Sequence, residues 1–320
     1  MFITLNNTKG SLNMRDFIIN FCKEYDYPAD ACSSLVSNYD KLMSKESVRA
    51  VFDKYLGEYE KCDKTNFGEF IVLAAKAGNE VEMDGRVTQF LCFVCAAKHL
   101  KVMYEKRGLP MDVYHSTCCD LRYKLMECHK MHGVWGSFVA SWFYGAFVLD
   151  RFEIGRLQYE FSKHFATEGN FSVCGLELTP ETPIINLHIP SSGPLTQESV
   201  DDSLSRAYKF MEKYYPEYIT DGKMVVECGS WLLFKDHEKF LPEKSNIRRF
   251  MDNFDIVHYW YDDNFGDCWR IFNVDWNGDA ASLPRNSSLQ RAYADWLAAG
   301  NRAGEGHGVL VYDGEKIINK

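Results

Sequence analysis

Apolar residues recur every three or four positions through the first 130 residues of the chain, which is the period of an amphipathic helix. In the segment MRDFIINFCKEY, Phe17, Phe21 and Tyr25 follow one another at four-residue spacing and share one helix face. The segment 87–108 closes on Gly108, a residue type that commonly stands just past a helix C-terminus. The pattern predicts helices over 14–25, 44–60, 66–78, 87–108 and 109–133.

After residue 150 the spacing shortens toward two, which is the period of a strand. In RFEIGRLQYEF, residues 151–161, apolar and polar side chains nearly alternate. No internal repeat and no low-complexity linker separates this part from the helical part, so the boundary near residues 130–150 is a change of period. The pattern predicts strands over 151–161, 182–190, 223–234, 255–263, 267–274 and 306–314, and helices over 197–215, 245–254 and 287–301.

Composition indicates a globular protein of one large or two ordinary domains. The 320 residues are 46% hydrophobic and 15% aromatic, which is enough for a packed core. A net charge of -9 argues against a nucleic-acid or anionic-membrane binder. The N-terminus lacks the pattern of a secretory signal, so the eleven cysteines are interpreted as reduced thiols in a soluble, cytoplasmic protein.

A turn of small residues joins the predicted strand 182–190 to a helix that begins near Thr196. Ser191, Ser192 and Gly193 allow close backbone approach, and the first N–H groups of a helix carry the positive end of its dipole. Such a turn either binds an anion or is a tight connection that binds nothing. Taken by themselves, the residues favour the plain connection.

Three further motifs contain residues typical of redox or metal sites, but each lacks a feature that such a site requires. Cys92 and Cys95 form a C-x-x-C inside an apolar helix, where buried thiols are the default. Zinc-type ligands occur in HSTCC and CHKMH, but His115 and His132 would lie about 25 Å apart along one helix. NVDWNGDAAS departs from a calcium loop in the place of its glycine and in lacking the final glutamate. We therefore expect no metal site.

Five motifs, taken in order, resemble bacterial acyltransferases that carry an all-helical N-terminal domain and a GNAT-like C-terminal domain. They are HGVWG, RFEIGRLQYE, LHIPSSGPL, SWLLFKDHEKFLPEKSNIRRFMDNF and SSLQRAYADWLAAG, and together they span roughly residues 130–305. The resemblance implies an α+β fold. In it, an all-helical N-terminal domain, residues 1–132, packs on a GNAT-like mixed α/β domain, residues 133–320.

The same resemblance implies acyl-CoA as the co-substrate, with acetyl-CoA expected. In GNAT folds the pantetheine arm of CoA pairs with the exposed backbone of a splayed central strand, and the pyrophosphate lies on the N-terminus of the next helix. The turn before Thr196 departs from the common pattern, because it holds one glycine and no basic residue. The residues expected to hold CoA are Asn186, Leu187, Ile189, Ser191, Ser192, Gly193, Leu195, Thr196 and Asn246.

Acyl transfer to an amine needs a base for the ammonium proton and an acid for the leaving thiolate. His188 titrates near neutrality and lies on the strand expected beside the thioester, so it is the first candidate base. Glu227 is the second, because burial in an apolar strand is expected to raise its pKa. Ser230 or a water molecule is the candidate acid, since Phe250 stands where related enzymes carry a tyrosine. The structural alternatives are a half-exposed strand histidine and a solvent-facing strand carboxylate.

Arg156, Glu160 and Trp231 are expected to bind the acceptor between the two domains, although Arg156 and Glu160 share a strand face and could pair instead. The sequence thus predicts a CoA-dependent acyltransferase that acts on an amine of a small molecule by direct attack, without a covalent enzyme intermediate. The alternative is a GNAT-like protein without catalysis that serves as a ligand-binding or scaffold protein.

Overall fold

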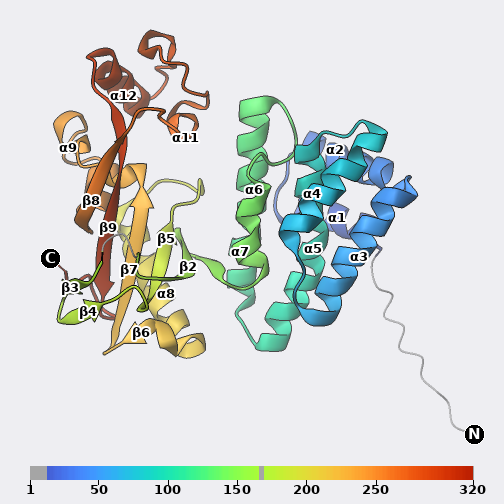
Figure 1. Ribbon diagram of the computed structural model, residues 1–320, viewed down its shortest axis with the longest axis horizontal. Helices are drawn as coiled ribbons and strands as arrows, with labels where there is room; N and C mark the ends of the chain where they lie inside the picture. The colour runs from blue at the N-terminus through green and yellow to red at the C-terminus, as the bar shows by residue number, and fades with distance from the viewer. Residues whose placement is uncertain (1–12, 166–168, 320) are drawn as a thin grey trace, which may run out of the picture. The chain divides into compact units, whose positions relative to one another are not determined.

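The computed structural model describes residues 13–165 and 169–319, which form two compact units (Figure 1). One unit holds the chain up to Gly108 together with Lys124–Val148, and the other holds Leu109–Tyr123 together with the chain from Leu149 onward. Helix α6 (Met111–His132) contributes to both units. The boundary predicted between residues 132 and 133 remains a prediction.

The first unit is helical, and the five helices predicted from the period of residues 14–133 are present. Helix α2, which was not predicted, carries its buried residues Ala31, Leu35 and Leu42 among serines and other polar residues, so its apolar stripe is weak in the sequence. The helices of this unit, besides α6, are α1 (Met14–Glu24), α2 (Ala29–Met43), α3 (Glu46–Cys62), α4 (Phe67–Gly78), α5 (Gly85–Arg107) and α7 (Tyr144–Phe147).

Helix α5 forms the core of this unit, because it is buried on nearly every side. Phe93 on α5 stacks on Phe67 with the ring centres 5.1 Å apart. The Tyr59 hydroxyl donates a 2.6 Å hydrogen bond to the Phe147 carbonyl and so satisfies its polar end inside the aromatic core. Gly108 ends α5 with φ +64°, as the sequence predicted.

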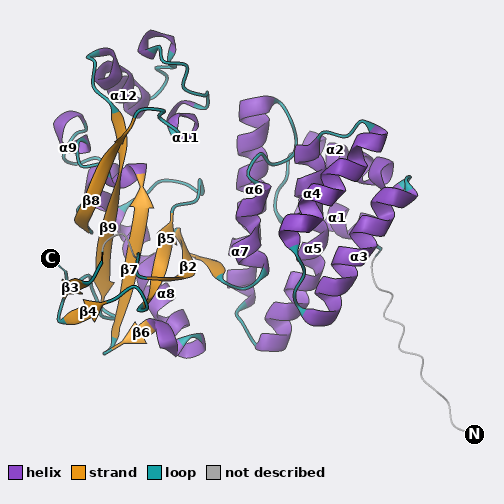
Figure 2. Ribbon diagram, in the orientation of Figure 1, coloured by secondary structure: helices purple, strands orange, loops and turns teal. Residues whose placement is uncertain are grey.

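The second unit is built on a sheet of the order β1-β2-β5-β7-β9-β8, with the short β6 paired to β7 (Figure 2). Only β5 and β7 pair in parallel among these described strands. The strands are β1 (Arg151–Ile154), β2 (Leu157–Lys163), β3 (Phe171–Val173), β4 (Leu176–Leu178), β5 (Pro183–His188), β6 (Ile219–Thr220), β7 (Lys223–Ser230), β8 (Asp255–Asp262) and β9 (Ala303–Tyr312), and the helices are α8 (Gln197–Tyr214), α9 (His237–Phe240), α10 (Asn246–Met251), α11 (Cys268–Phe272) and α12 (Ser288–Ala298).

The two faces of this sheet differ in chemistry. Helix α8 packs on the apolar face, where Phe152 of β1 meets Phe210 of α8 with ring centres 5.0 Å apart. On the same face, the Tyr159 hydroxyl lies 2.9 Å from Ser203 Oγ of α8. Successive strand residues point to opposite faces, so the polar residues between these positions point to the other side. The mixed sheet under a covering helix confirms the predicted α+β class.

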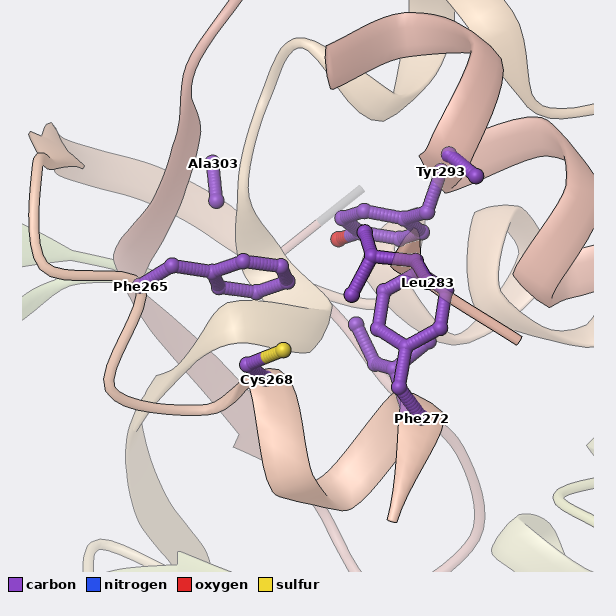
Figure 3. Packing of buried hydrophobic residues seen from close by; sticks show 8 residues of the cluster. Phe265, Cys268, Phe272, Leu283, Tyr293 and Ala303 are labelled. Carbon is purple, nitrogen blue, oxygen red and sulfur yellow. The ribbon is translucent and has the colours of Figure 1, made fainter. Parts of the chain in front are cut away.

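Residues 267–274 contain the helix α11 (Cys268–Phe272) in place of the predicted strand. Cys268, Ile271 and Phe272 are buried at helical spacing, and a short apolar run of this kind fits either period. Figure 3 shows Cys268 and Phe272 pointing into a cluster with Phe265, Leu283 and Tyr293. The tertiary cluster therefore decides the element.

The predicted strand 151–161 is in fact two strands joined by a tight turn. Gly155 adopts φ +67°, which favours glycine, and it lets β1 fold back on β2 with Ile154 opposite Leu157. The turn places Arg156 outside both strands. The strand predicted over 223–234 ends earlier, at Ser230, where a turn of 3-10 helix follows (Trp231–Leu233).

Candidate functional site

Strands β5 and β7 separate partway along their length. Their parallel ladder consists of Ile185 opposite Val226 and Asn186 opposite Glu227, and the structure describes every residue of both strands. Beyond these pairs β5 continues to His188 and β7 to Ser230 without pairing to each other. Figure 1 shows the two strands side by side in the sheet. The divergence leaves backbone donors and acceptors of β5 without a β7 partner, which an extended ligand can use.

A single row of polar residues crosses four strands at this point. Arg151 lies opposite Glu160, Glu160 opposite Asn186, and Asn186 opposite Glu227. Cross-strand partners share a face, so the row lies on the side of the sheet away from α8. Val226 and Cys228, the neighbours of Glu227 on β7, therefore point to the opposite face, and the row brings together three predicted site residues, Glu160, Asn186 and Glu227.

His188 lies two positions beyond Asn186 on the same face and pairs with Glu160. Its Nε2 is 2.7 Å from Glu160 Oε2, with the His188 and Glu160 side chains 22% and 27% exposed. The buried Arg151 donates to the other Glu160 oxygen at 3.4 Å. Because Glu160 accepts at Nε2–H, this tautomer puts the lone pair of the imidazole on Nδ1.

Electrostatics keep His188 neutral and Glu160 ionised at neutral pH. Burial lowers the pKa of His188 below 6.5, although the hydrogen bond and charge of Glu160 act in the opposite direction. Burial alone would raise the pKa of Glu160, but the hydrogen bond from His188 and the charge of Arg151 hold it below its usual value. Asp120 on α6, a buried carboxylate, also acts on His188 and Arg151. The pair has the protonation states that a base and its orienting carboxylate require.

The side chain of Glu227 is fully buried and lies beside two histidines. The Nδ1 atom of His164 bonds to one carboxylate oxygen, while the other accepts the Phe165 N–H at 3.2 Å and lies 3.4 Å from His307 Nε2. Burial raises the pKa of Glu227, but the hydrogen bonds from His307 and His164 outweigh it and hold the pKa below its usual value. The raised pKa predicted from the sequence is therefore wrong, because a carboxylate with several donors favours its charged form.

Arg156 does not pair with Glu160, whose carboxylate is engaged by His188 and Arg151. The guanidinium of Arg156 reaches instead into the turn after β5. It donates to the carbonyls of Pro190 at 2.8 Å, Gly193 at 2.8 Å and Pro194 at 3.2 Å. The turn that lacks a basic residue in the sequence thus receives one from the β1–β2 turn.

The turn itself has features that suit an anionic ligand. Thr196 is the N-cap of α8, as predicted, and accepts the Ser199 N–H at 3.3 Å. Gly193 has φ +141°, a conformation that favours glycine. The Ser192 Oγ atom is buried and has no hydrogen-bond partner among the described residues, so a ligand oxygen would satisfy it.

Three other predicted residues have structural roles in the fold. Ser230 caps the 3-10 turn after β7 and accepts the Leu232 N–H at 3.2 Å. Asn246 is the first residue of α10, and the N-cap is Ser245. Trp231 packs partly buried against the cluster of Figure 3, with its ring centre 6.0 Å from that of Tyr293.

Sequence reasoning missed Arg151, His164 and His307, which contact the predicted carboxylates. Arg151 and Glu153 alternate with apolar residues in RFEI, so a signal for a polar strand face was present. His164 and His307 lie 63 and 80 positions from Glu227, and no local pattern connects residues at such separations.

Within residues 13–165 and 169–319 no group of three or more His, Cys, Asp and Glu side chains is placed to hold a metal ion. Over the same ranges the helices are too short or too polar to cross a membrane.

Comparisons with known proteins identify the class to which this fold and site belong. The family model of an N-acyltransferase N-terminal domain matches residues 16–149, and that of a GNAT-like C-terminal domain matches residues 151–310. The chain therefore belongs to the acyltransferase family that combines these two domains. The resemblance stated from the five sequence motifs is confirmed.

Solved acyltransferase structures share the fold. A crystal structure of an acyltransferase in complex with decanoyl-CoA and teicoplanin has a TM-score of 0.66 at 20% identity, covering 91% of this chain and 86% of that chain. A crystal structure of an acyltransferase in complex with decanoyl-CoA has a TM-score of 0.67 at 21% identity, with the same coverage. A mutant acyltransferase with octanoyl-CoA has a TM-score of 0.67 at 20% identity, covering 92% and 87%. No curated protein matches the sequence.

Proposed function

We propose that this protein transfers an acyl group from acyl-CoA to an amine of a small molecule, by direct attack and without a covalent enzyme intermediate. The observation that carries the proposal is the separation of β5 and β7 beyond Asn186 and Glu227, with a neutral histidine on the strand that diverges. Membership of the acyltransferase family and a fold shared with acyl-CoA complexes support it.

The pantetheine arm of CoA would lie along residues 186–189 and pair with the backbone beyond Asn186, where the ladder between β5 and β7 ends. The pyrophosphate would lie over the turn, held by backbone N–H groups and hydroxyls of residues 191–196 at the start of α8. Asn246, at the first position of α10, is proposed as an additional CoA contact.

His188 would act as the general base, through Nδ1, toward the ammonium form of the acceptor. Glu160 fixes the ring by accepting at Nε2–H, and Arg151 behind it keeps that carboxylate ionised. The free amine then attacks the thioester carbonyl, the C–N bond forms, and the C–S bond breaks to release the thiolate of CoA. Ser230 or a water molecule would return a proton to that sulfur.

The acyl group and the acceptor are proposed by class. Acetyl-CoA follows from the sequence resemblance, whereas related folds are known in complex with decanoyl-CoA and octanoyl-CoA. One of those structures also contains teicoplanin, so a large amine-bearing organic acceptor belongs in any screen beside amino acids and aminosugars.

The test is calorimetric titration with CoA, acetyl-CoA, octanoyl-CoA and decanoyl-CoA, followed by a thiol-release screen against amines. We expect binding near micromolar Kd for at least one of these ligands, and Gly193→Asp to abolish it by placing a side chain and a negative charge in the turn. Binding without thiol release from any amine would favour the non-catalytic ligand-binding protein. Failure of all four ligands to bind would overturn the enzyme proposal.

A further inference from the structure

In the second unit, the side chain of Arg156 is hydrogen-bonded to the turn after β5. One side chain donates to three carbonyls, those of Pro190, Gly193 and Pro194, which lie 34 to 38 positions away in the chain. A guanidinium presents five donors in a fixed planar fork, so it can hold several acceptors in one geometry. Such a fork fixes the orientation of the whole turn.

That orientation has a consequence for the amide groups. In a trans peptide the carbonyl of one residue and the N–H of the next point in opposite directions. Because the Pro190 and Pro194 carbonyls point toward Arg156, the N–H groups of Ser191 and Leu195 point away from it. These two peptide groups therefore direct their carbonyl oxygens to the guanidinium and their N–H donors to the opposite side of the turn.

The positive charge of Arg156 also favours an anion at this turn. Carbonyl oxygens directed at a phosphate would repel it, and here three of them are occupied by a cation instead. Burial lowers the pKa of Arg156, yet a guanidinium stays protonated at any physiological pH. Arg156 therefore supplies a positive charge to a turn whose own residues carry none.

We propose that Arg156 is a positioning residue for the phosphates of CoA, which sets the amide donors of Ser191 and Leu195 and supplies the positive charge that this turn lacks. This inference rests on the proposed function, in which the same turn binds the CoA pyrophosphate. It replaces the acceptor-binding role that the sequence suggested for Arg156, because its donors are engaged by the turn.

The experiment compares CoA with pantetheine, which has the same arm but no phosphate. Kd values for both are measured with the full chain and its Arg156→Gln, Arg156→Lys and Arg291→Gln variants. Arg291→Gln is the matched control. Arg291 also donates to loop carbonyls, those of Arg285 and Asn286, and its substitution removes the same charge. Thermal midpoints of all four proteins show whether each remains folded.

We expect Arg156→Gln to weaken CoA binding about tenfold or more and to change pantetheine binding less than about twofold. Arg156→Lys should restore only part of the affinity, because one ammonium group cannot serve three carbonyls in a plane. Arg291→Gln should bind both ligands like the unaltered protein.

An unchanged Kd for CoA in Arg156→Gln would overturn the inference, and so would an equal loss for CoA and pantetheine. Full restoration by Arg156→Lys would show that charge alone suffices and would overturn the positioning role. If the unaltered protein binds neither CoA nor its acyl esters, the proposed function itself fails, which is a different result from any of these.

Discussion

Two histidine–carboxylate pairs lie on the same face of one sheet and differ in how far solvent reaches them. In the pair of His188 and Glu160 the side chains are 22% and 27% exposed. In the pair of His164 and Glu227 both side chains are fully buried, and His307 beside them is 4% exposed. The two pairs share the same chemical groups, so their surroundings decide what each can do.

Solvent exposure distinguishes the pair that we propose to be catalytic from the buried pair. A base must meet its substrate, and His188 combines solvent access with a pKa that burial lowers below 6.5. The Glu227 cluster instead attaches the segment after β2 to β7 through His164 and the Phe165 N–H. A buried ionised group that loses its partner is strongly destabilising, so this cluster belongs to the stability of the sheet.

The largest effect is expected at the exposed pair. His188→Ala should reduce kcat by about 10²- to 10⁴-fold, because the base is lost, while the Kd for CoA stays the same. Thiol release and calorimetry measure the two quantities. The control is His258→Ala, an exposed histidine on the same sheet face. Equal kcat in His188→Ala and the unaltered protein would remove His188 from the mechanism.

The buried pair should respond in stability. Glu227→Gln is expected to lower the free energy of unfolding by about 1.5 to 3 kcal/mol, because two buried histidines and the Phe165 N–H lose a charged hydrogen-bond acceptor. Urea denaturation measures this difference. Glu217→Gln, which alters an exposed carboxylate in the same unit, should stay within about 0.5 kcal/mol of the unaltered protein. A loss in Glu227→Gln no larger than that of the control would contradict the structural role.

A smaller effect is expected for the orienting carboxylate. Glu160→Gln should reduce kcat roughly tenfold, since it weakens a charged hydrogen bond but leaves the base in place. Glu160 raises the pKa of His188 against the effect of burial, so its loss should move the acidic limb of kcat/KM to lower pH. Profiles of kcat/KM from pH 4.5 to 8 test this, and an acidic limb that moves to higher pH would contradict the orienting role of Glu160.

The smallest effect concerns stability at acidic pH. The folded-state pKa of Glu227 lies below its ordinary value of 4.5, so its contribution to stability is complete above that value. The contribution is lost as the pH falls from there through the folded-state pKa, because the unfolded chain then binds a proton that the folded chain does not. Urea denaturation between pH 3 and 6 gives the free energy of unfolding at each pH. This free energy should fall less steeply with decreasing pH for Glu227→Gln than for the unaltered protein. Parallel curves would argue against an ionised Glu227.

Much of the fold could be predicted from local pattern. The period of Phe17, Phe21 and Tyr25 and the closing Gly108 gave helices where the structure has them. The start of α8 was predicted near Thr196, which is the N-cap of that helix. Residues 267–274 were misassigned because a short segment with five apolar residues fits both periods, and the packing of Figure 3 selects the helix.

The amino-acid sequence by itself determined the type of most of the long helices and strands and the small-residue turn before α8. These depend on spacing between neighbours, which the chain carries in linear order. Tertiary structure alone decided that Arg156 holds that turn, that Glu160 orients His188, and that two distant histidines keep Glu227 ionised. The reason is physical, since pKa and charge pairing depend on strand register and burial, which arise only when residues far apart in sequence meet.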